Sequence, residues 1–160
     1  MTKQSEGVPC LFDPQLGDVP HCLYKNSQSE LFISPAFLRD LSFDRNGLAA
    51  VRALPEGWMY ANRQGKVVIA GVAESDNWAD SFHDGLVRVF RDGKYGFANR
   101  KGKIVIAPVY DGALNFQNGI TAVCQGCQNK CVDTHCEYHS FVGGRWFQLN
   151  TKGNKVIVLH

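Results

Sequence analysis

The sequence has no long hydrophobic run, no marked excess of one charge and no motif of a familiar enzyme class. Its 160 residues carry 17 Lys or Arg against 15 Asp or Glu, which gives a formal net charge of +2. This balance argues against a nucleic-acid partner held by bulk charge, and the missing apolar run argues against a transmembrane segment. The five histidines lack metalloprotease spacing, and the glycines form no phosphate-binding loop. We therefore expect a protein that is not an enzyme.

A secretory signal is also missing, because residues 1–9 contain no apolar core. Two interpretations are open at this point. Either the protein is cytoplasmic, or it is exported and its signal peptide is absent from this sequence.

What the sequence does contain is a repeat. Phe43, Phe82 and Phe116 each begin a short polar segment that ends in glycine, at steps of 39 and 34 residues. An aromatic residue, an Asn-x-x-Gly turn and an apolar run then follow, in the ranges 58–69, 95–106 and 146–157. In the same register Asn26 matches Asn99, which adds a half-copy upstream. The repeats therefore run from about residue 22 to residue 160, after a non-repeating N-terminal arm at 1–21.

This pattern predicts an all-β fold made of tandem antiparallel β-hairpins. The apolar runs are short and β-branched, and turn residues bound them. In each Asn-x-x-Gly turn, Asn caps the turn and Gly supplies a positive φ. One unit cannot bury its apolar face alone and must stack on its neighbours. We expect about three and a half units in one solenoid-like or partly closed β domain.

The repeat resembles the WG-repeat (KWG-repeat) family, which is found mostly in bacteria. The resemblance is carried by residues 93–97, 102–111 and 116–119, whose sequences are GKYGF, GKIVIAPVYD and FQNG. The chain departs from the family at its name-giving dipeptide, because Tyr95 replaces the Trp of the best copy, while Met59 and Phe147 replace the Gly of the other two. The resemblance implies an interaction scaffold with no catalytic residue.

Most aromatic residues recur in phase with the repeat and are expected in its core, including Trp58, Tyr95 and Trp146. Trp78 is out of phase, in a lengthened connection that is rich in carboxylates. There it could anchor a partner protein, or it could fold back over the sheet edge. The candidates for partner binding in this connection are Asp76, Trp78, Asp80 and His83.

The sharpest chemical feature is an insertion at 124–139 in the last full repeat. It holds Cys124, Cys127, Cys131, Cys136 and His139. Three interpretations compete: a structural zinc bound by the four cysteines and the histidine, two disulfides that staple a polar loop, and a redox-active Cys-x-x-Cys pair. The last is the weakest, because the chain offers no βαβ setting for it.

A second cysteine pair favours disulfides over zinc. Cys10 and Cys22 lie far from the insertion and complete an even count of six. A bridge between them would fasten the N-terminal arm to the first unit and would contribute about 3 kcal/mol. Because disulfides persist in oxidising compartments, the protein is expected to be periplasmic or secreted, with a cytoplasmic location as the alternative.

These observations predict a non-enzymatic protein-binding module of the bacterial cell envelope. The partner of this module is expected to be another protein. In one concrete version, the module is an immunity-type inhibitor and its partner is a secreted toxin. No cofactor is expected. The alternative is a cytoplasmic zinc-binding interaction scaffold, and a hydrolase or thiol oxidoreductase is a remote third reading.

Overall fold

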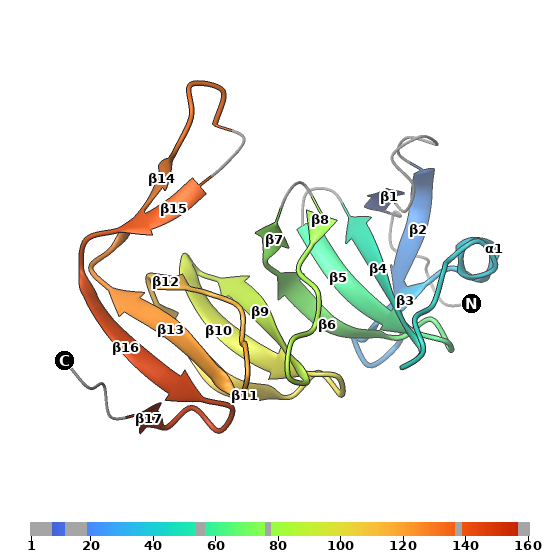
Figure 1. Cartoon of the computed structure of the whole chain (residues 1–160). Coiled ribbons are helices and arrows are strands. Elements are labelled where there is room, and N and C mark those ends of the chain that lie inside the picture. Colours follow the sequence, from blue (N-terminus) through green and yellow to red (C-terminus); the bar gives the residue numbers. More distant parts are fainter. Residues whose placement is uncertain (1–7, 12–18, 54–56, 76–77, 137–138, 157–160) are drawn as a thin grey trace. The chain divides into compact units, whose positions relative to one another are not determined.

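The computed structural model describes residues 8–11, 19–53, 57–75, 78–136 and 139–156, with side chains described from Cys22 onward. Nearly all of the described elements are antiparallel β-strands, and they form two compact units, Met1–Val72 and Ala73–His160 (Figure 1). The prediction of an all-β fold made of hairpin repeats is confirmed. No described helix is long and apolar enough to cross a membrane.

The first unit contains an antiparallel sheet with the strand order β6-β5-β4-β1-β2-β3. Its elements are β1 (Val8–Leu11), β2 (Val19–Lys25), β3 (Leu31–Ile33), α1 (Pro35–Leu38), β4 (Leu48–Ala53), β5 (Gly57–Asn62) and β6 (Val67–Val72). β1 comes from the predicted N-terminal arm and pairs with both β2 and β4, so the arm contributes a strand to the sheet. Buried side chains of β2 to β5 form the core, among them Leu23, Ile33, Val51 and Met59.

The second unit contains two sheets and two short ribbons. The sheets have the strand orders β11-β10-β9 and β12-β13-β16-β17, and the ribbons pair β7 with β8 and β14 with β15. The bounds are β7 (Glu74–Ser75), β8 (Trp78–Ala79), β9 (Leu86–Arg91), β10 (Lys94–Asn99), β11 (Ile104–Tyr110), β12 (Gly112–Ala113), β13 (Ile120–Gln125), β14 (Gln128–Cys131), β15 (His139–Val142), β16 (Arg145–Asn150) and β17 (Lys155–Val156). Both sheets contribute to one core, which includes Phe97, Phe116, Val123 and Leu149.

The Asn turns repeat with the same hydrogen bonds in every copy. In each turn the Asn side-chain oxygen accepts the backbone N–H groups two and four residues later, at Asn26, Asn62, Asn99 and Asn150. The glycine of the turn has a positive φ in the last three copies, and Ser29, with φ 62°, takes its place in the first. The predicted half-copy at Asn26 therefore forms the same turn as the full copies.

Gly96 shows why a glycine suits the second position of the name-giving dipeptide. A Cβ atom on Gly96 would lie 2.5 Å from the Ile106 carbonyl oxygen and 2.6 Å from the Pro108 nitrogen, both on the paired strand β11. There β11 bulges, advancing four residues from Ile106 to Tyr110 while β10 advances two. At the equivalent place in β5, Met59 is accommodated beside a smaller bulge and is buried in the core.

The prediction that all in-phase aromatics are core residues is wrong for Trp146. Trp58 is buried and Tyr95 is half-buried, whereas Trp146 in β16 is 41% exposed. Its indole Nε1 donates a hydrogen bond to the Gly143 carbonyl. Trp146 belongs to the last copy, and beyond it the described part of the sheet adds only the two residues of β17.

Candidate binding surface of the second unit

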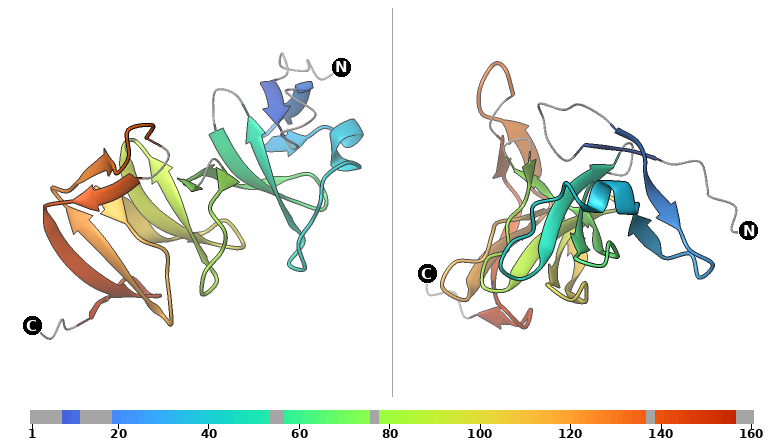
Figure 2. Two further views of the ribbon diagram at one scale, coloured as in Figure 1. Left: turned by 45° about the horizontal axis from the view of Figure 1, so that its top comes forward. Right: turned by 90° about the vertical axis from the view of Figure 1, so that its right-hand side faces the viewer.

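Two segments of the second unit depart from the regular repeat. One is the β7–β8 ribbon, and the other is the extension at residues 126–144, which carries the β14–β15 ribbon between β13 and β16. In Figure 1 both ribbons lie toward the top of this unit, and the β10–β11 and β16–β17 turns lie toward the bottom. The β14–β15 ribbon projects away from the sheets, as the right-hand view of Figure 2 also shows.

Asp80 was a candidate for partner binding, and the structure corrects this assignment. Its side chain is 1% exposed and forms a bidentate pair with Arg88, with Nε–Oδ2 and Nη2–Oδ1 distances of 2.5 and 3.0 Å. The Ser75 hydroxyl also donates to Asp80. Arg88 completes the network by donating from Nη1 to the Ala113 carbonyl oxygen at 2.7 Å. Asp80 therefore holds the β7–β8 ribbon onto β9 and β12 and is not available at the surface.

The other candidates in this connection differ in exposure. Trp78 is 38% exposed in β8, opposite Ser75 in the ribbon, and His83 is exposed in the turn before β9. Asp76 lies outside the described residues. Trp78 and His83 thus keep surface that a partner could contact.

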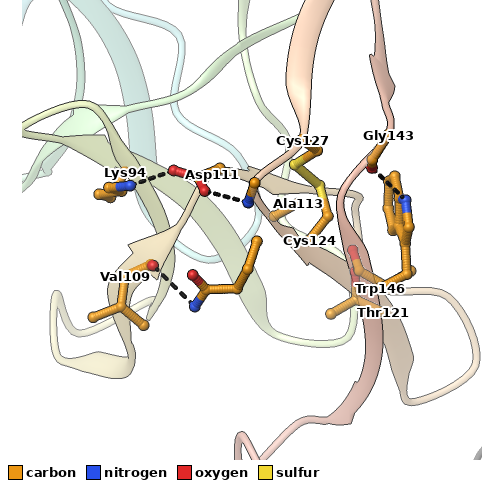
Figure 3. Close-up of a disulfide and its surroundings, with 12 residues drawn as sticks. Lys94, Val109, Asp111, Ala113, Thr121, Cys124, Cys127, Gly143 and Trp146 are labelled. Carbon is orange, nitrogen blue, oxygen red and sulfur yellow. Dashed lines mark hydrogen bonds and ion pairs between the residues drawn. A yellow bond between two sulfur atoms is a disulfide. The ribbon is translucent and has the colours of Figure 1, made fainter.

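The base of the β14–β15 ribbon is fastened by the disulfide between Cys124 and Cys127 (Figure 3). Both cysteines are buried, at 0% and 8% exposure. The neighbouring backbone is packed so tightly that a Cβ atom on Gly112 would lie 2.6 Å from the Cys124 sulfur and 2.6 Å from a ring carbon of Phe141. The ribbon is therefore joined to the sheet through a covalent and closely packed neck.

Asp111 adds a polar clamp to the same neck. Its Oδ2 atom accepts the Gly126 backbone N–H at 2.6 Å, and its other oxygen pairs with the Lys94 ammonium group (Figure 3). Its backbone N–H donates to the Cys124 carbonyl oxygen. The hydrogen bond from Lys94, followed by that from Gly126, lowers the pKa of the Asp111 carboxyl below its ordinary value of 3.8.

Tyr95 connects the ribbon with the Asp80–Arg88 network. Its ring meets Phe141 of β15 edge to face, with ring centroids 5.5 Å apart, and the Arg88 guanidinium lies 5.6 Å from its centroid. Burial raises the pKa of the Tyr95 hydroxyl, and the positive charge of Arg88 opposes this rise. Both departures from the repeat are thus anchored to one cluster of side chains on β9 and β10.

The tip of the ribbon carries the second disulfide, between Cys131 and Cys136, and both residues are exposed. His139 pairs with Cys131 across the ribbon, and its Nε2 atom lies 3.5 Å from the Cys136 sulfur. The five proposed zinc ligands are thus divided between two places. Cys124 and Cys127 are bonded to each other at the base, and Cys131, Cys136 and His139 gather at the tip.

The sequence predicts a disulfide between Cys10 and Cys22, and the structure describes the side chain of Cys22 only. Cys22 is disulfide-bonded in the core of the first unit, and its strand β2 pairs with β1, which carries Cys10. The side chain of Cys10 lies outside the described residues.

The WG-containing repeat family matches this chain twice, over residues 58–95 and 95–131. Residues 58–131 therefore carry two WG-containing repeats. The two matches include the turns at Asn62 and Asn99 and the bulges of β6 and β11, and the second match runs into the β14–β15 ribbon. Separate comparisons with curated proteins and with solved structures find no significant match.

Sequence reasoning did not identify the side chains that anchor the two ribbons to the WG repeats. Arg88 lies between Val87 and Val89, where strand alternation suggests a solvent-facing side chain, yet it is buried. For Lys94 and Asp111 a signal was present, since both belong to the motif segments that resemble the family. No signal pointed to Phe141, which lies in the extension at residues 126–144, beyond the cysteine-rich insertion that the sequence defines.

Proposed function

We propose that this WG-repeat protein is a non-enzymatic protein-binding module of the bacterial cell envelope and that the β14–β15 ribbon is its main contact surface. Repeats of this kind form protein-interaction modules. The observation that carries the proposal is the exposure of the ribbon: all four residues of β14 and three of the four in β15 are exposed.

The ribbon combines this exposure with apolar side chains and a fixed base. Val132 is 67% exposed, and Val142 and Trp146 are exposed near the neck. Exposed apolar residues on and beside a projecting element can provide contacts for a partner. Because the disulfide, the Asp111 clamp and Phe141 already hold the neck, binding would order few additional residues, which lowers its entropic cost.

An oxidising compartment is supported by the disulfides of the described residues. Cys124–Cys127 and Cys131–Cys136 are bonded, and Cys22 is also disulfide-bonded. Such bonds persist in the periplasm or outside the cell and are rare in the cytosol. The envelope is therefore the location that we propose.

An immunity-type inhibitor of a secreted toxin is the specific version that we propose. A small protein with a rigid, exposed ribbon suits the obstruction of a toxin's active site, and the sequence contains no catalytic motif of its own. In the test, a candidate secreted toxin is exported by cells with and without the wild-type protein, which should protect them. Loss of protection when the ribbon is removed supports this version, and unchanged protection without the ribbon contradicts it.

The test of the ribbon itself uses a shortened hairpin. Residues 126–144 are replaced by Asp-Gly, because the paired residues Arg91 and Lys94 are joined by that dipeptide in the neighbouring hairpin. Cys124→Ala accompanies the change, so that no unpaired buried thiol is left.

Wild type, the shortened variant and Lys101→Glu are then compared for partner capture from envelope extract. Lys101→Glu is the matched control, because it alters an exposed turn at the opposite end of the hairpins. We expect wild type and control to capture the same protein and the shortened variant, still folded by circular dichroism, to lose it. Equal capture by the shortened variant would contradict the proposal.

A cytoplasmic zinc-binding scaffold is the second candidate, and one observation favours it. The ligand atoms of Cys131, Cys136 and His139 all lie within 4.8 Å of one another. Thiol counting and metal analysis on protein purified from its native compartment distinguish the two functions. One bound zinc with reactive thiols supports the scaffold, and no free thiol with no metal supports the envelope module.

A further inference from the structure

The two disulfides of the ribbon have opposite environments. The Cys124–Cys127 pair at the base is buried, and a reductant cannot reach it while the neck stays packed. Cys131 and Cys136 at the tip are both exposed, as are the flanking residues Lys130 and Val132. Since thiol–disulfide exchange requires access to a sulfur atom, a dithiol will attack the tip first.

Reduction of the tip leaves three metal-binding side chains in a suitable arrangement. Two ligands of a tetrahedral zinc ion, one sulfur at about 2.3 Å and one nitrogen at about 2.0–2.1 Å, lie about 3.5 Å apart. The Cys136 sulfur and the His139 Nε2 atom are separated by 3.5 Å in the oxidised structure. The Cys131 sulfur then needs only to move away from its former partner, to the separation of about 3.8 Å that two thiolates on one zinc adopt.

We propose that reduction of the Cys131–Cys136 disulfide converts the tip of the ribbon into a Zn²⁺ site made of two thiolates and one imidazole. A dithiol gives two electrons and two protons to the disulfide, is itself oxidised to a disulfide, and leaves two free thiols on the protein. Zn²⁺ then binds both sulfurs as thiolates and His139 through Nε2, and two protons are released. The oxidised tip has no thiolate and does not hold the ion.

The site so formed has three protein ligands and leaves the fourth position of a tetrahedral zinc open. Structural zinc sites with four protein ligands are closed, whereas three-ligand sites accept water or an outside ligand. The fourth position faces solvent, since all three ligands are exposed. The redox state of the surroundings would thus decide whether the tip is a closed disulfide loop or a metal centre open to a further ligand. This inference does not depend on the proposed function.

The experiment measures zinc binding as a function of redox state. The full-length protein is treated anaerobically with increasing dithiothreitol, thiol labelling and peptide mapping follow each disulfide, and Zn²⁺ is titrated against a chromophoric chelator. We expect no zinc bound by the oxidised protein and one zinc per chain once Cys131 and Cys136 are reduced, with Cys124 and Cys127 still bonded. Co²⁺ in place of zinc should show thiolate charge-transfer absorption.

Matched variants assign the ligands. His139→Ala should weaken zinc binding by more than about tenfold, since even the loss of a group that only supports a ligand costs 10–100-fold. His135→Ala, an exposed histidine beside Cys136 but outside the cluster, should leave the affinity unchanged. Zinc binding by the oxidised protein, binding that requires reduction of Cys124–Cys127, or equal affinity of His139→Ala and wild type would each overturn the proposal.

Discussion

The hairpins β9–β10 and β13–β16 occupy equivalent places in neighbouring repeats and end in very different ways. Their registers match pair for pair, with Tyr95 opposite Phe90 in one and Trp146 opposite Cys124 in the other. The first hairpin closes with Asp92 and Gly93, and the second continues into residues 126–144. The repeat thus fixes the paths of the strands and leaves the end of a hairpin free to vary, provided that its base is fastened.

The plain hairpin supplies what fastens the extended one. Arg88, Lys94 and Tyr95 all belong to β9 or β10, and through their contacts they hold the β7–β8 ribbon, Asp111 and Phe141. The extended hairpin contributes the exposed surface. The anchoring contacts and the exposed surface therefore lie in two adjacent copies, and the following variants test that separation.

The largest effect is expected from breaking the Arg88 network in the plain hairpin. Arg88→Met leaves the Asp80 carboxylate buried without its positive partner, which should lower the free energy of unfolding by about 3–5 kcal/mol. Urea denaturation followed by fluorescence measures this loss. The double variant Asp80→Asn/Arg88→Met removes both charges and should recover part of it. A double variant no more stable than Arg88→Met would mean that the charge of Asp80 is not the cause.

The two disulfides of the extended hairpin should differ in their effect on global stability. Replacing Cys124 and Cys127 by alanine should cost about 2 kcal/mol or more, because the loop is no longer closed and a buried pair is lost. Replacing Cys131 and Cys136 should change the free energy of global unfolding by less than about 0.5 kcal/mol. The exposed tip is then free to open in the folded protein as well as in the unfolded chain, so the loop-closure terms of the two states cancel. Equal losses in denaturant titrations of both double variants would contradict the distinction between base and tip.

The contact between Tyr95 of the plain hairpin and Phe141 of the extended hairpin should contribute moderately to the free energy of unfolding. A double-mutant cycle with Tyr95→Ala and Phe141→Ala should give a coupling of about 0.5–1.5 kcal/mol, as expected for an edge-to-face aromatic pair. Both single variants and the double variant are measured by thermal and urea unfolding. A coupling near zero would show that Phe141 does not tie the ribbon to β10.

The smallest effect on stability is expected from removing the carboxylate of Asp111, and this effect should depend on pH. The pKa of Asp111 in the folded protein lies below its ordinary value of 3.8. The contribution to stability is therefore fully present above pH 3.8 and is lost as the pH falls through the folded-state pKa. Asp111→Asn should show a weaker loss of stability than wild type over this range, measured as the urea midpoint against pH. Parallel curves for the two proteins would contradict this.

The fold could be predicted from the sequence because each hairpin turn is specified locally. The repeat register alone predicts a turn at Asn26, and the Asn26 side chain makes the same two hydrogen bonds as those of Asn62 and Asn99. Even the replacement of glycine by Ser29 leaves the turn intact. Such turns depend on five consecutive residues, so the printed sequence contains all the information they require.

The candidate surface was predicted less well because its anchors depend on distant segments. The burial of Asp80 depends on Arg88, which lies on strand β9, and Arg88 is itself held by Ser75 of β7 and lies over the ring of Tyr95. The exposure of Trp146 depends on which segments pack against β16, and the repeat pattern does not specify these. The cysteines were found by spacing, and only the structure separated the base pair from the tip pair.

The Asn turns also bear on how the chain folds. Each turn closes its backbone and side-chain hydrogen bonds within five residues, so no long loop must be closed before the first strands meet. The described chain holds four such turns, and in a repeat array folding can start at any of them and spread to the neighbours. During synthesis the turn at Asn26 can form long before Asn150 has been added. The ribbon tip, which lies farthest from any Asn turn along its hairpin, would then be among the last parts to acquire its native pairing.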